Sequence, residues 1–192
     1  MAELMARSPL GHRAAELADV VATTEGRVSL AEIPFLGQVD VRVSRDEVIR
    51  RQLLLPLDPN TVLRAGERAA LWLGPDEWLV VGAAGSAGAI VSELESALNG
   101  AHLSIVDVSA NRAWLELRGP GARELLSRGC SLDLHAGHWL AGMCAQTVLA
   151  RSHVLLEQRE DATTWIGVRP SFADYLVDWL LDACRRIGDR EL

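Results

Sequence analysis

Residues 71–98, LWLGPDEWLVVGAAGSAGAIVSELESAL, contain the pattern that decides the fold. Two short apolar runs flank a GPDE turn and predict a β-hairpin, with Trp72 and Trp78 near its two ends. An amphipathic helix is expected next, because apolar residues recur at spacings of one to four: Ile90, Val91, Leu94 and Leu98. Ser86 is the expected N-cap, and Asn99-Gly100 suits the helix end because glycine adopts the left-handed conformation at little cost.

The same order of elements recurs in residues 155–183, LLEQREDATTWIGVRPSFADYLVDWLLDA. Each stretch reads as a strand, a turn, a strand with a tryptophan, a short break and an amphipathic helix. Few residues are identical between the two stretches, so a degenerate duplication stays open as one explanation. The pattern predicts an α+β fold of two small halves, in which helices pack on antiparallel sheets.

The N-terminal α+β half is expected to cover residues 1–100, with an extended arm to about residue 28. Alternating residues predict a strand over 33–43. A short helix is expected after Ser44, because Glu47 stands three residues later and completes a capping box.

The C-terminal α+β half is expected to cover residues 101–192. Its first strands, LSIVDV and RAWLELR, predict a hairpin that turns at residues 109–111. A helix in GPGARELLSRG and three successive strands, CAQTVLAR, HVLLEQ and TTWIGV, are expected to follow. The last helix places one group of residues on a single face: Phe172, Tyr175, Leu176, Trp179, Leu180 and Cys184.

Composition excludes several classes of function. The chain has 192 residues and a formal net charge of −7, which disfavours nucleic-acid binding because phosphates require a basic surface. All 19 basic residues are arginines, so neither a Schiff-base lysine nor a P-loop lysine is available. The longest mildly apolar stretch, residues 78–91, is shorter than a membrane span, and we expect no membrane insertion.

Three cysteines, Cys130, Cys144 and Cys184, form an odd and sparse set. Such a set is typical of reduced thiols in the cytoplasm rather than of a disulfide framework. The first 21 residues carry scattered charges and no apolar block, so we expect no secretory signal. The predicted location is therefore the cytoplasm.

A glycine-rich segment offers a first candidate for ligand binding. Gly82, Gly85 and Gly88 precede a predicted helix, which resembles a dinucleotide site in outline. The spacing is G-x-x-G-x-x-G rather than G-x-G-x-x-G, and the preceding strand belongs to a predicted hairpin. A flexible connection into the helix is the favoured interpretation, with nucleotide binding as the alternative.

A second candidate combines thiols and imidazoles. Cys130, His135, His138 and Cys144 have side chains that suit tetrahedral zinc, although their spacing matches no zinc finger. Cys130 or Ser127 are alternative nucleophiles, but neither lies in a G-x-S-x-G elbow. The sequence therefore predicts no catalytic, cofactor-binding or metal-binding residue in this chain.

Tryptophan usage favours a protein that contacts other chains. Six tryptophans stand against two phenylalanines and one tyrosine, and tryptophan and arginine are enriched at interface hot spots. Trp139, in the loop HAGHWLAGM, is the residue that we expect to meet a partner, with packing inside the chain as the alternative.

Four segments taken in order resemble the gamma subunit of heterotetrameric sarcosine oxidase. They are LGPDEWLV, VDVSANRAWLELRGPGARELLSRGCSLDLH, CAQTVLARSHVLLEQ and RPSFADYLVDWLLDA, and the SPL near the N-terminus extends the resemblance over most of the chain. The resemblance implies a fold related to the folate-binding domains of the glycine-cleavage aminomethyltransferase.

The family resemblance also implies a division of labour among alpha, beta, gamma and delta subunits. The complex oxidises sarcosine to glycine with oxygen, giving peroxide and 5,10-methylenetetrahydrofolate. FAD and FMN are expected on the beta subunit, NAD and tetrahydrofolate on the alpha subunit, and zinc on the delta subunit. The gamma subunit is expected to hold none of these and to act as a non-catalytic assembly subunit.

Two further interpretations accompany this resemblance. Cys130 is expected to pack inside the scaffold, and Asp107 and Arg112, which flank a turn, are expected to form a structural pair. The alternative function is a free-standing folate- or nucleotide-binding module, which would bind its ligand without any partner.

Overall fold

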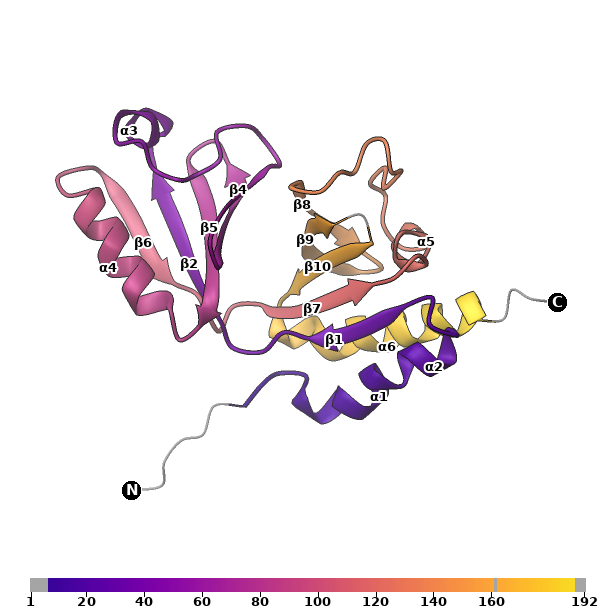
Figure 1. Cartoon of the computed structure of the whole chain (residues 1–192). Helices are drawn as coiled ribbons and strands as arrows, with labels where there is room; N and C mark the ends of the chain where they lie inside the picture. Colours follow the sequence, from indigo (N-terminus) through magenta and orange to yellow (C-terminus); the bar gives the residue numbers. More distant parts are fainter. Residues whose placement is uncertain (1–6, 161, 189–192) are drawn as a thin grey trace, which may run out of the picture.

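The computed structural model describes residues 7–160 and 162–188, and the expectations that concern residues 1–6, 161 and 189–192 lie outside this part of the chain. Two five-stranded antiparallel sheets form its framework. Figure 1 shows the two sheets next to each other, with helix α4 (Ala87–Ala97) on the outer side of one and helix α6 (Pro170–Gly188) along the other. The α+β class of two antiparallel sheets with packed helices is confirmed.

The first sheet has the strand order β3-β4-β5-β2-β6. Its strands are β2 (Leu36–Val43), β3 (Val62–Ala65), β4 (Arg68–Gly74), β5 (Glu77–Ala84) and β6 (Leu103–Asp107). Helix α3 (Arg45–Arg50) lies between β2 and β3 in the sequence. Ser44 caps it as expected, because the Ser44 hydroxyl accepts a hydrogen bond from the Glu47 amide at 3.4 Å.

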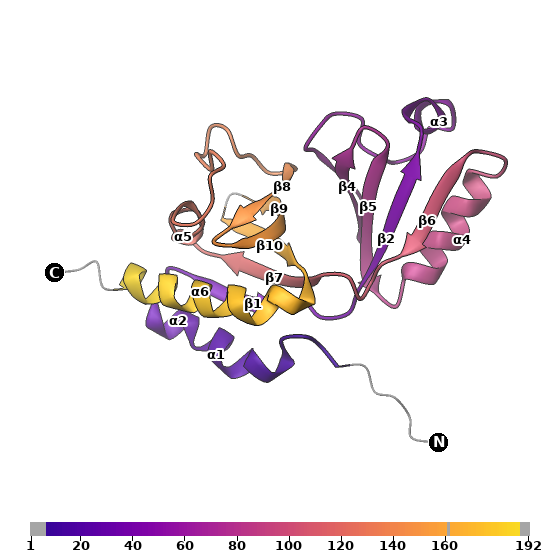
Figure 2. The same ribbon diagram turned by 180° about the vertical axis from the view of Figure 1, so that it is seen from behind.

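The second sheet has the strand order β1-β7-β10-β9-β8. Its strands are β1 (Ser29–Glu32), β7 (Ala113–Arg118), β8 (Cys144–Leu149), β9 (Ser152–Glu160) and β10 (Thr163–Val168). Helix α5 (Ala122–Ser127) follows β7, and α6 follows β10. Seen from behind in Figure 2, α6 and the N-terminal helices run along the side of this sheet that faces away from the first sheet.

The two sheets repeat one arrangement. The series β2-α3-β3-β4-β5-α4 corresponds, element by element, to β7-α5-β8-β9-β10-α6, and each series gives the same strand order in its sheet. The remaining edge position is filled by β6 beside β2 in one sheet and by β1 beside β7 in the other. The hairpin and helix that recur in the sequence are therefore the same part of two structural repeats.

Alternation along the strands explains the three apolar layers. In β5, Trp78 and Val80 face α4, whereas Leu79 and Val81 face the second sheet. Because both faces of β5 are buried, its sequence is a continuous apolar run rather than an alternating one. A third layer, between the second sheet and α6, is the largest and also takes in the N-terminal helices and α5.

The first hairpin differs from its expected geometry at the tryptophans. Trp72 and Trp78 pair directly across β4 and β5, beside the turn rather than at opposite ends. Trp78 is fully buried, and its indole nitrogen donates to the Pro56 carbonyl at 2.7 Å. The loop that precedes β3 is thereby attached to the hairpin.

The start of α4 also differs in detail from the prediction. Ser86 occupies the N-cap position, but its side chain makes no cap hydrogen bond. Its hydroxyl donates instead to the Ala83 carbonyl at 2.7 Å. The helix ends as expected, and Gly100 has a φ of 78° just beyond it.

The N-terminal arm is helical, contrary to the extended conformation expected from sequence. A short 3₁₀ helix η1 (Gly11–Arg13) leads into α1 (Ala14–Ala18) and α2 (Val20–Thr23). Leu17 and Val20 are buried in the layer beneath the second sheet. Tertiary packing of two apolar residues thus orders a segment whose own periodicity is too short to predict a helix.

Strands β6 and β7 do not form the expected hairpin. β6 pairs with β2 in the first sheet, whereas β7 pairs with β1 and β10 in the second. The connection crosses between sheets and is held by Gln38, whose side-chain amide donates to the Ser109 and Arg112 carbonyls at 2.9 and 3.0 Å. A hairpin cannot form because each strand is already committed to a different sheet.

Each of the two expected halves, divided at residue 100, contributes one strand to the sheet of the other half. β1 lies in the sheet of the C-terminal half, and β6, which follows residue 100, lies in the sheet of the N-terminal half. The N-terminal helices also pack under the second sheet. The division into an N-terminal half, residues 1–100, and a C-terminal half, residues 101–192, stays a prediction.

The buried face of α6 is shifted from the predicted one. Leu176, Leu180 and Cys184 are buried as expected, but Phe172 and Tyr175 are 49% and 40% exposed. The helix buries Ala173, Val177 and Ala183 instead, because small residues allow its close approach to the sheet. Two aromatic side chains of α6 are left on the surface.

Candidate functional site

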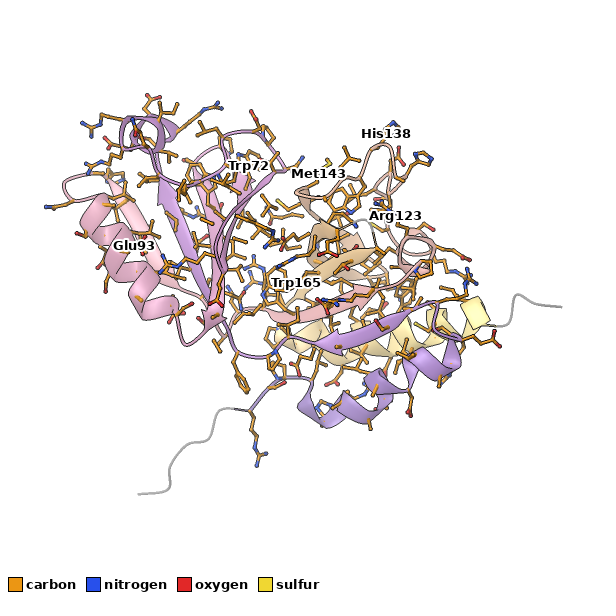
Figure 3. The ribbon with its side chains drawn as sticks, in the orientation of Figure 1. Trp72, Glu93, Arg123, His138, Met143 and Trp165 are labelled. Carbon is orange, nitrogen blue, oxygen red and sulfur yellow. The ribbon has the colours of Figure 1, made fainter. Side chains whose placement is uncertain are left out.

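The cysteines and histidines do not gather into one site. Cys130 is partly buried beside Thr147, with 3.9 Å between its sulfur and the threonine hydroxyl. The His138 ring forms a hydrogen bond with the Asp133 carboxylate in the outer loop, and Figure 3 shows His138 at the rim of the molecule. Across residues 7–160 and 162–188, no three His, Cys, Asp or Glu side chains are placed to hold a metal ion. The zinc alternative drawn from the sequence is therefore not supported in this part of the chain.

Burial makes two thiols poor nucleophiles. Cys144 is fully buried between the sheets, and burial raises the pKa of its thiol to about 12. Its sulfur lies 3.4 Å from the Thr61 carbonyl and 3.5 Å from the Trp72 carbonyl. Burial also raises the pKa of Cys184 to about 11. Both thiols stay protonated near neutral pH and act as packing groups.

The glycine-rich segment serves the packing of a strand against a helix. Gly82 lies in β5, an antiparallel strand, so a dinucleotide-binding βαβ unit is absent at this point. A Cβ atom at Gly82 would lie 2.6 Å from the Ser86 hydroxyl oxygen, and one at Gly37 would meet the same atom at the same distance. The glycines therefore allow two neighbouring strands to approach the start of α4.

Trp139 lies inside the chain. Its side chain is 4% exposed and belongs to the apolar layer beneath the second sheet. The indole nitrogen is buried without a hydrogen-bond partner among the described residues. Packing, the alternative considered from sequence, accounts for this position, and a contact between Trp139 and another subunit stays a prediction. Its neighbour Leu140 is 49% exposed.

Asp107 and Arg112 each have other neighbours. The Asp107 carboxylate accepts hydrogen bonds from the Ser109 amide at 2.9 Å and the Ser109 hydroxyl at 2.5 Å, and these bonds lower the Asp107 pKa. Within the described residues no ion pair joins it to Arg112. The turn is stabilised by Ser109 and Gln38 in place of the expected ion pair.

An ion pair connects the two sheets from within. Arg64 of β3 pairs with Glu157 of β9, whose side chain is 1% exposed. Burial, together with the positive charge of Arg159, lowers the pKa of Arg64 to about 10. The pair lies beside Trp165, which Figure 3 shows on the side of the second sheet that faces the first. The pair therefore links β3 of the first sheet to β9 of the second.

An apolar groove lies over the first sheet. Its volume is about 620 Å³, and it is lined by the loop before β3, by β3 and β4, and by α4. Leu54 and Leu63 line it and are 66% and 38% exposed, and the nearby Ile49 is 52% exposed. At its rim Arg68 and Glu93 form an ion pair at 2.5 Å. We call this feature the β3–α4 groove.

Sequence reasoning missed the β3–α4 groove. The apolar run LLLPL at residues 53–57 is a signal, because it places four leucines where the short helix predicted after Ser44 gives way to a loop. Only the tertiary structure shows which of these leucines are exposed. Leu55 is buried at 5% exposure, whereas Leu54 next to it lies open to solvent.

No helix in residues 7–160 and 162–188 is long and apolar enough to cross a membrane.

Comparison with solved structures relates the whole chain to known proteins. A chain of the heterotetrameric sarcosine oxidase from Corynebacterium sp. U-96, in complex with pyrrole 2-carboxylate, matches with a TM-score of 0.89 and 30% identity, covering 98% of this chain and 100% of that one. The aminomethyltransferase T of the glycine cleavage system from Bartonella henselae matches with a TM-score of 0.64 and 17% identity over 88% of this chain and 49% of that one. The second match shows a shared fold, as the sequence resemblance implied.

Sequence comparisons give the same assignment. A sarcosine oxidase subunit gamma from an Arthrobacter species is 36% identical over 184 residues, which cover 92% of this chain and 89% of the relative. The subunit gamma from Corynebacterium sp. (strain U-96) is 32% identical over 193 residues, covering 97% and 93%. The model of the sarcosine oxidase, gamma subunit family matches residues 48–186. The chain therefore belongs to the sarcosine oxidase gamma subunit family.

Proposed function

We propose that this chain is a non-catalytic assembly subunit of a heterotetrameric sarcosine oxidase. One observation supports the proposal above the others: the chain superposes over its full length on a chain of a heterotetrameric sarcosine oxidase, at a TM-score of 0.89. The match covers 98% of this chain and 100% of that chain.

The proposed partners are alpha, beta and delta subunits in the cytoplasm. The complex would oxidise sarcosine to glycine, reduce oxygen to peroxide and transfer the one-carbon unit to tetrahydrofolate as 5,10-methylenetetrahydrofolate. In this proposal FAD, FMN, NAD and tetrahydrofolate bind to other subunits, and zinc binds to the delta subunit. The gamma subunit contributes shape and contact area.

The side chains of the described residues suit this role better than a role in catalysis. Burial holds Cys144 and Cys184 protonated, and Cys130 packs beside Thr147. The β3–α4 groove instead offers exposed leucines. Their removal from water by a partner would lower the free energy of the complex. Two aromatic residues of α6, Phe172 and Tyr175, offer a second apolar contact.

The proposal is tested by expressing the alpha, beta and delta subunits with and without this chain in the native host. We expect sarcosine-dependent peroxide formation, and a stable flavin-containing complex, only when the chain is present. The chain alone should be colourless and inactive. An active three-subunit enzyme of unchanged stability without the chain would contradict the assembly role.

The folate- or nucleotide-binding module remains the competing function. It predicts that the isolated chain binds tetrahydrofolate or a nucleotide in equilibrium dialysis, with no dependence on other subunits. The assembly subunit is expected to bind neither.

A further inference from the structure

A second cavity, of about 420 Å³, lies at one end of the second sheet. The register of β7 and β10 shows where the cavity lies. Ala113 of β7 and Val168 of β10 are the last paired residues at this end, and Arg112 and Arg169 are their neighbours in the sequence, one position beyond the pairing. Gly167, which pairs with both Trp114 and Leu155, also lines the cavity. The two arginines therefore come from neighbouring strands and line the same space.

The lining of this cavity is cationic and contains no acidic side chain. Besides Arg112 and Arg169, it is formed by polar and apolar residues: Ser131, Gln146, Thr147, Val148, His153, Val154, Leu155 and Gly167. Such a composition contrasts with a chain whose net charge is −7. The positive charge is local to the cavity and does not reflect the overall charge of the protein.

Neither guanidinium has a partner among the described residues. The hydrogen bonds and ion pairs that arginines form in this region involve other arginines, and Arg112 takes part only through its backbone carbonyl, which accepts from Gln38. Asp40 and Glu77 are the acids that act on Arg112 at longer range, and both pair with Arg42, at 3.5 and 2.8 Å. Arg42 offsets one of these two negative charges.

Two unpartnered guanidinium groups in one partly enclosed space are unfavourable without an anion. Burial and the charge of Arg169 both lower the pKa of Arg112, because loss of water and a nearby positive charge both disfavour the charged guanidinium. A guanidinium presents five donors in a planar fork, which matches the oxygens of a carboxylate or phosphate. An oxyanion between the arginines would satisfy both forks and cancel their repulsion.

We propose that this cavity is a binding site for an oxyanion, a carboxylate or phosphate group held between Arg112 and Arg169. The same chemistry has two possible sources. One is a small free anion, and the other is an Asp or Glu side chain of another subunit; the second source rests on the proposed function, whereas the first does not. His153, Ser131 and Thr147 line the site and contribute polar groups.

The test compares the full chain with the double variant Arg112→Gln/Arg169→Gln. The control is Arg45→Gln, which removes one positive charge, as each of the two substitutions does, from an exposed arginine that is distant in sequence from the cavity. Thermal unfolding is recorded in sodium phosphate, in sodium citrate and in sodium chloride of equal ionic strength. If the source is a free anion, phosphate or citrate raises Tm by about 3 °C or more over chloride. The double variant loses this shift and Arg45→Gln keeps it.

The second arm purifies the unmodified chain, the double variant and Arg45→Gln through a tag and measures how much of the other subunits is recovered with each. If the source is a partner's carboxylate, Tm does not depend on the anion, and the double variant recovers roughly tenfold less of the other subunits than Arg45→Gln does. Should the double variant unfold, the single variant of the exposed Arg169 is used in both arms. Equal Tm in all three salts together with undiminished recovery would overturn the proposal. Failure of the unmodified chain to recover subunits contradicts the proposed function and leaves the first arm valid.

Discussion

At the residue scale, Cys144 shows how burial removes reactivity. The thiol has an ordinary pKa of 9.0, which rises to about 12 between the two sheets. The unfolded chain therefore ionises this thiol at lower pH than the folded chain does. Its contribution to stability is full below pH 9.0 and is lost as the pH rises toward about 12.

We predict that a thiol reagent distinguishes the three cysteines. At pH 8 the partly exposed Cys130 reacts first, whereas Cys144 and Cys184 react slowly because they are buried and protonated. Peptide mass spectrometry after timed quenching gives the order, and labelling in urea is the control in which all three react. Early labelling of Cys144 in the native chain would contradict its assigned burial.

Gly119 is a residue that no side chain can replace without strain. Its φ is 112°, and a Cβ atom would lie 2.3 Å from the Arg27 carbonyl oxygen. We predict that Gly119→Ala lowers the free energy of unfolding by about 2 kcal/mol or more. Gly88→Ala is the matched control, because nothing lies within 4 Å of its Cβ position, and helix propensity favours alanine there by up to about 1 kcal/mol. Urea unfolding measures both; equal losses would show that the contact with Arg27 is unimportant.

At the scale of elements, local patterns predicted most strands and helices correctly. The hairpins β4-β5 and β9-β10 and helices α3, α4 and α6 follow from periodicity and capping, which depend on residues close in sequence. The crossing from β6 to β7 could not be predicted in this way, because it depends on Gln38, which lies about 70 residues earlier. The N-terminal helices likewise depend on distant packing.

We predict that Gln38→Leu destabilises this crossing. Gln38 is 1% exposed, and its loss leaves the Ser109 and Arg112 carbonyls without their donor. The expected cost is roughly 2 kcal/mol or more, measured as the free energy of unfolding in urea. Gln146→Leu is the control, because the exposed Gln146 donates one hydrogen bond, to Leu73, and its loss should cost about 1 kcal/mol or less. A smaller loss for Gln38→Leu than for Gln146→Leu would refute this account of the crossing.

The candidate sites were predictable only in part for the same reason. Arg112 stood out in the sequence beside Asp107, but the structure places it with Arg169, 57 positions away, through the pairing of β7 with β10. Trp139 stood out by residue type. Whether a tryptophan can contact a partner depends on its exposure, which is a property of the folded chain, and Trp139 is buried.

At the scale of the whole molecule, the two sheets are joined by an apolar layer and by the ion pair between the partly exposed Arg64 and the buried Glu157. We predict that Arg64→Met costs about 3–5 kcal/mol, because Glu157 is left buried without a counter-charge. The double variant Arg64→Met/Glu157→Leu should recover most of the loss. Differential scanning calorimetry measures these changes.

The surface pair Arg68–Glu93 provides the matched control for that experiment. Both side chains are exposed, so Arg68→Met should cost less than about 1 kcal/mol. Similar costs for Arg64→Met and Arg68→Met would mean that the inter-sheet pair does not hold the sheets together.

The central claim, that this chain is a subunit of a four-chain oxidase, is tested most directly by the intact mass of the particle purified through a tag on this chain. Native mass spectrometry is expected to show one copy of this 20.8 kDa chain together with three different chains. A particle that contains this chain alone, or only copies of it, would contradict the claim.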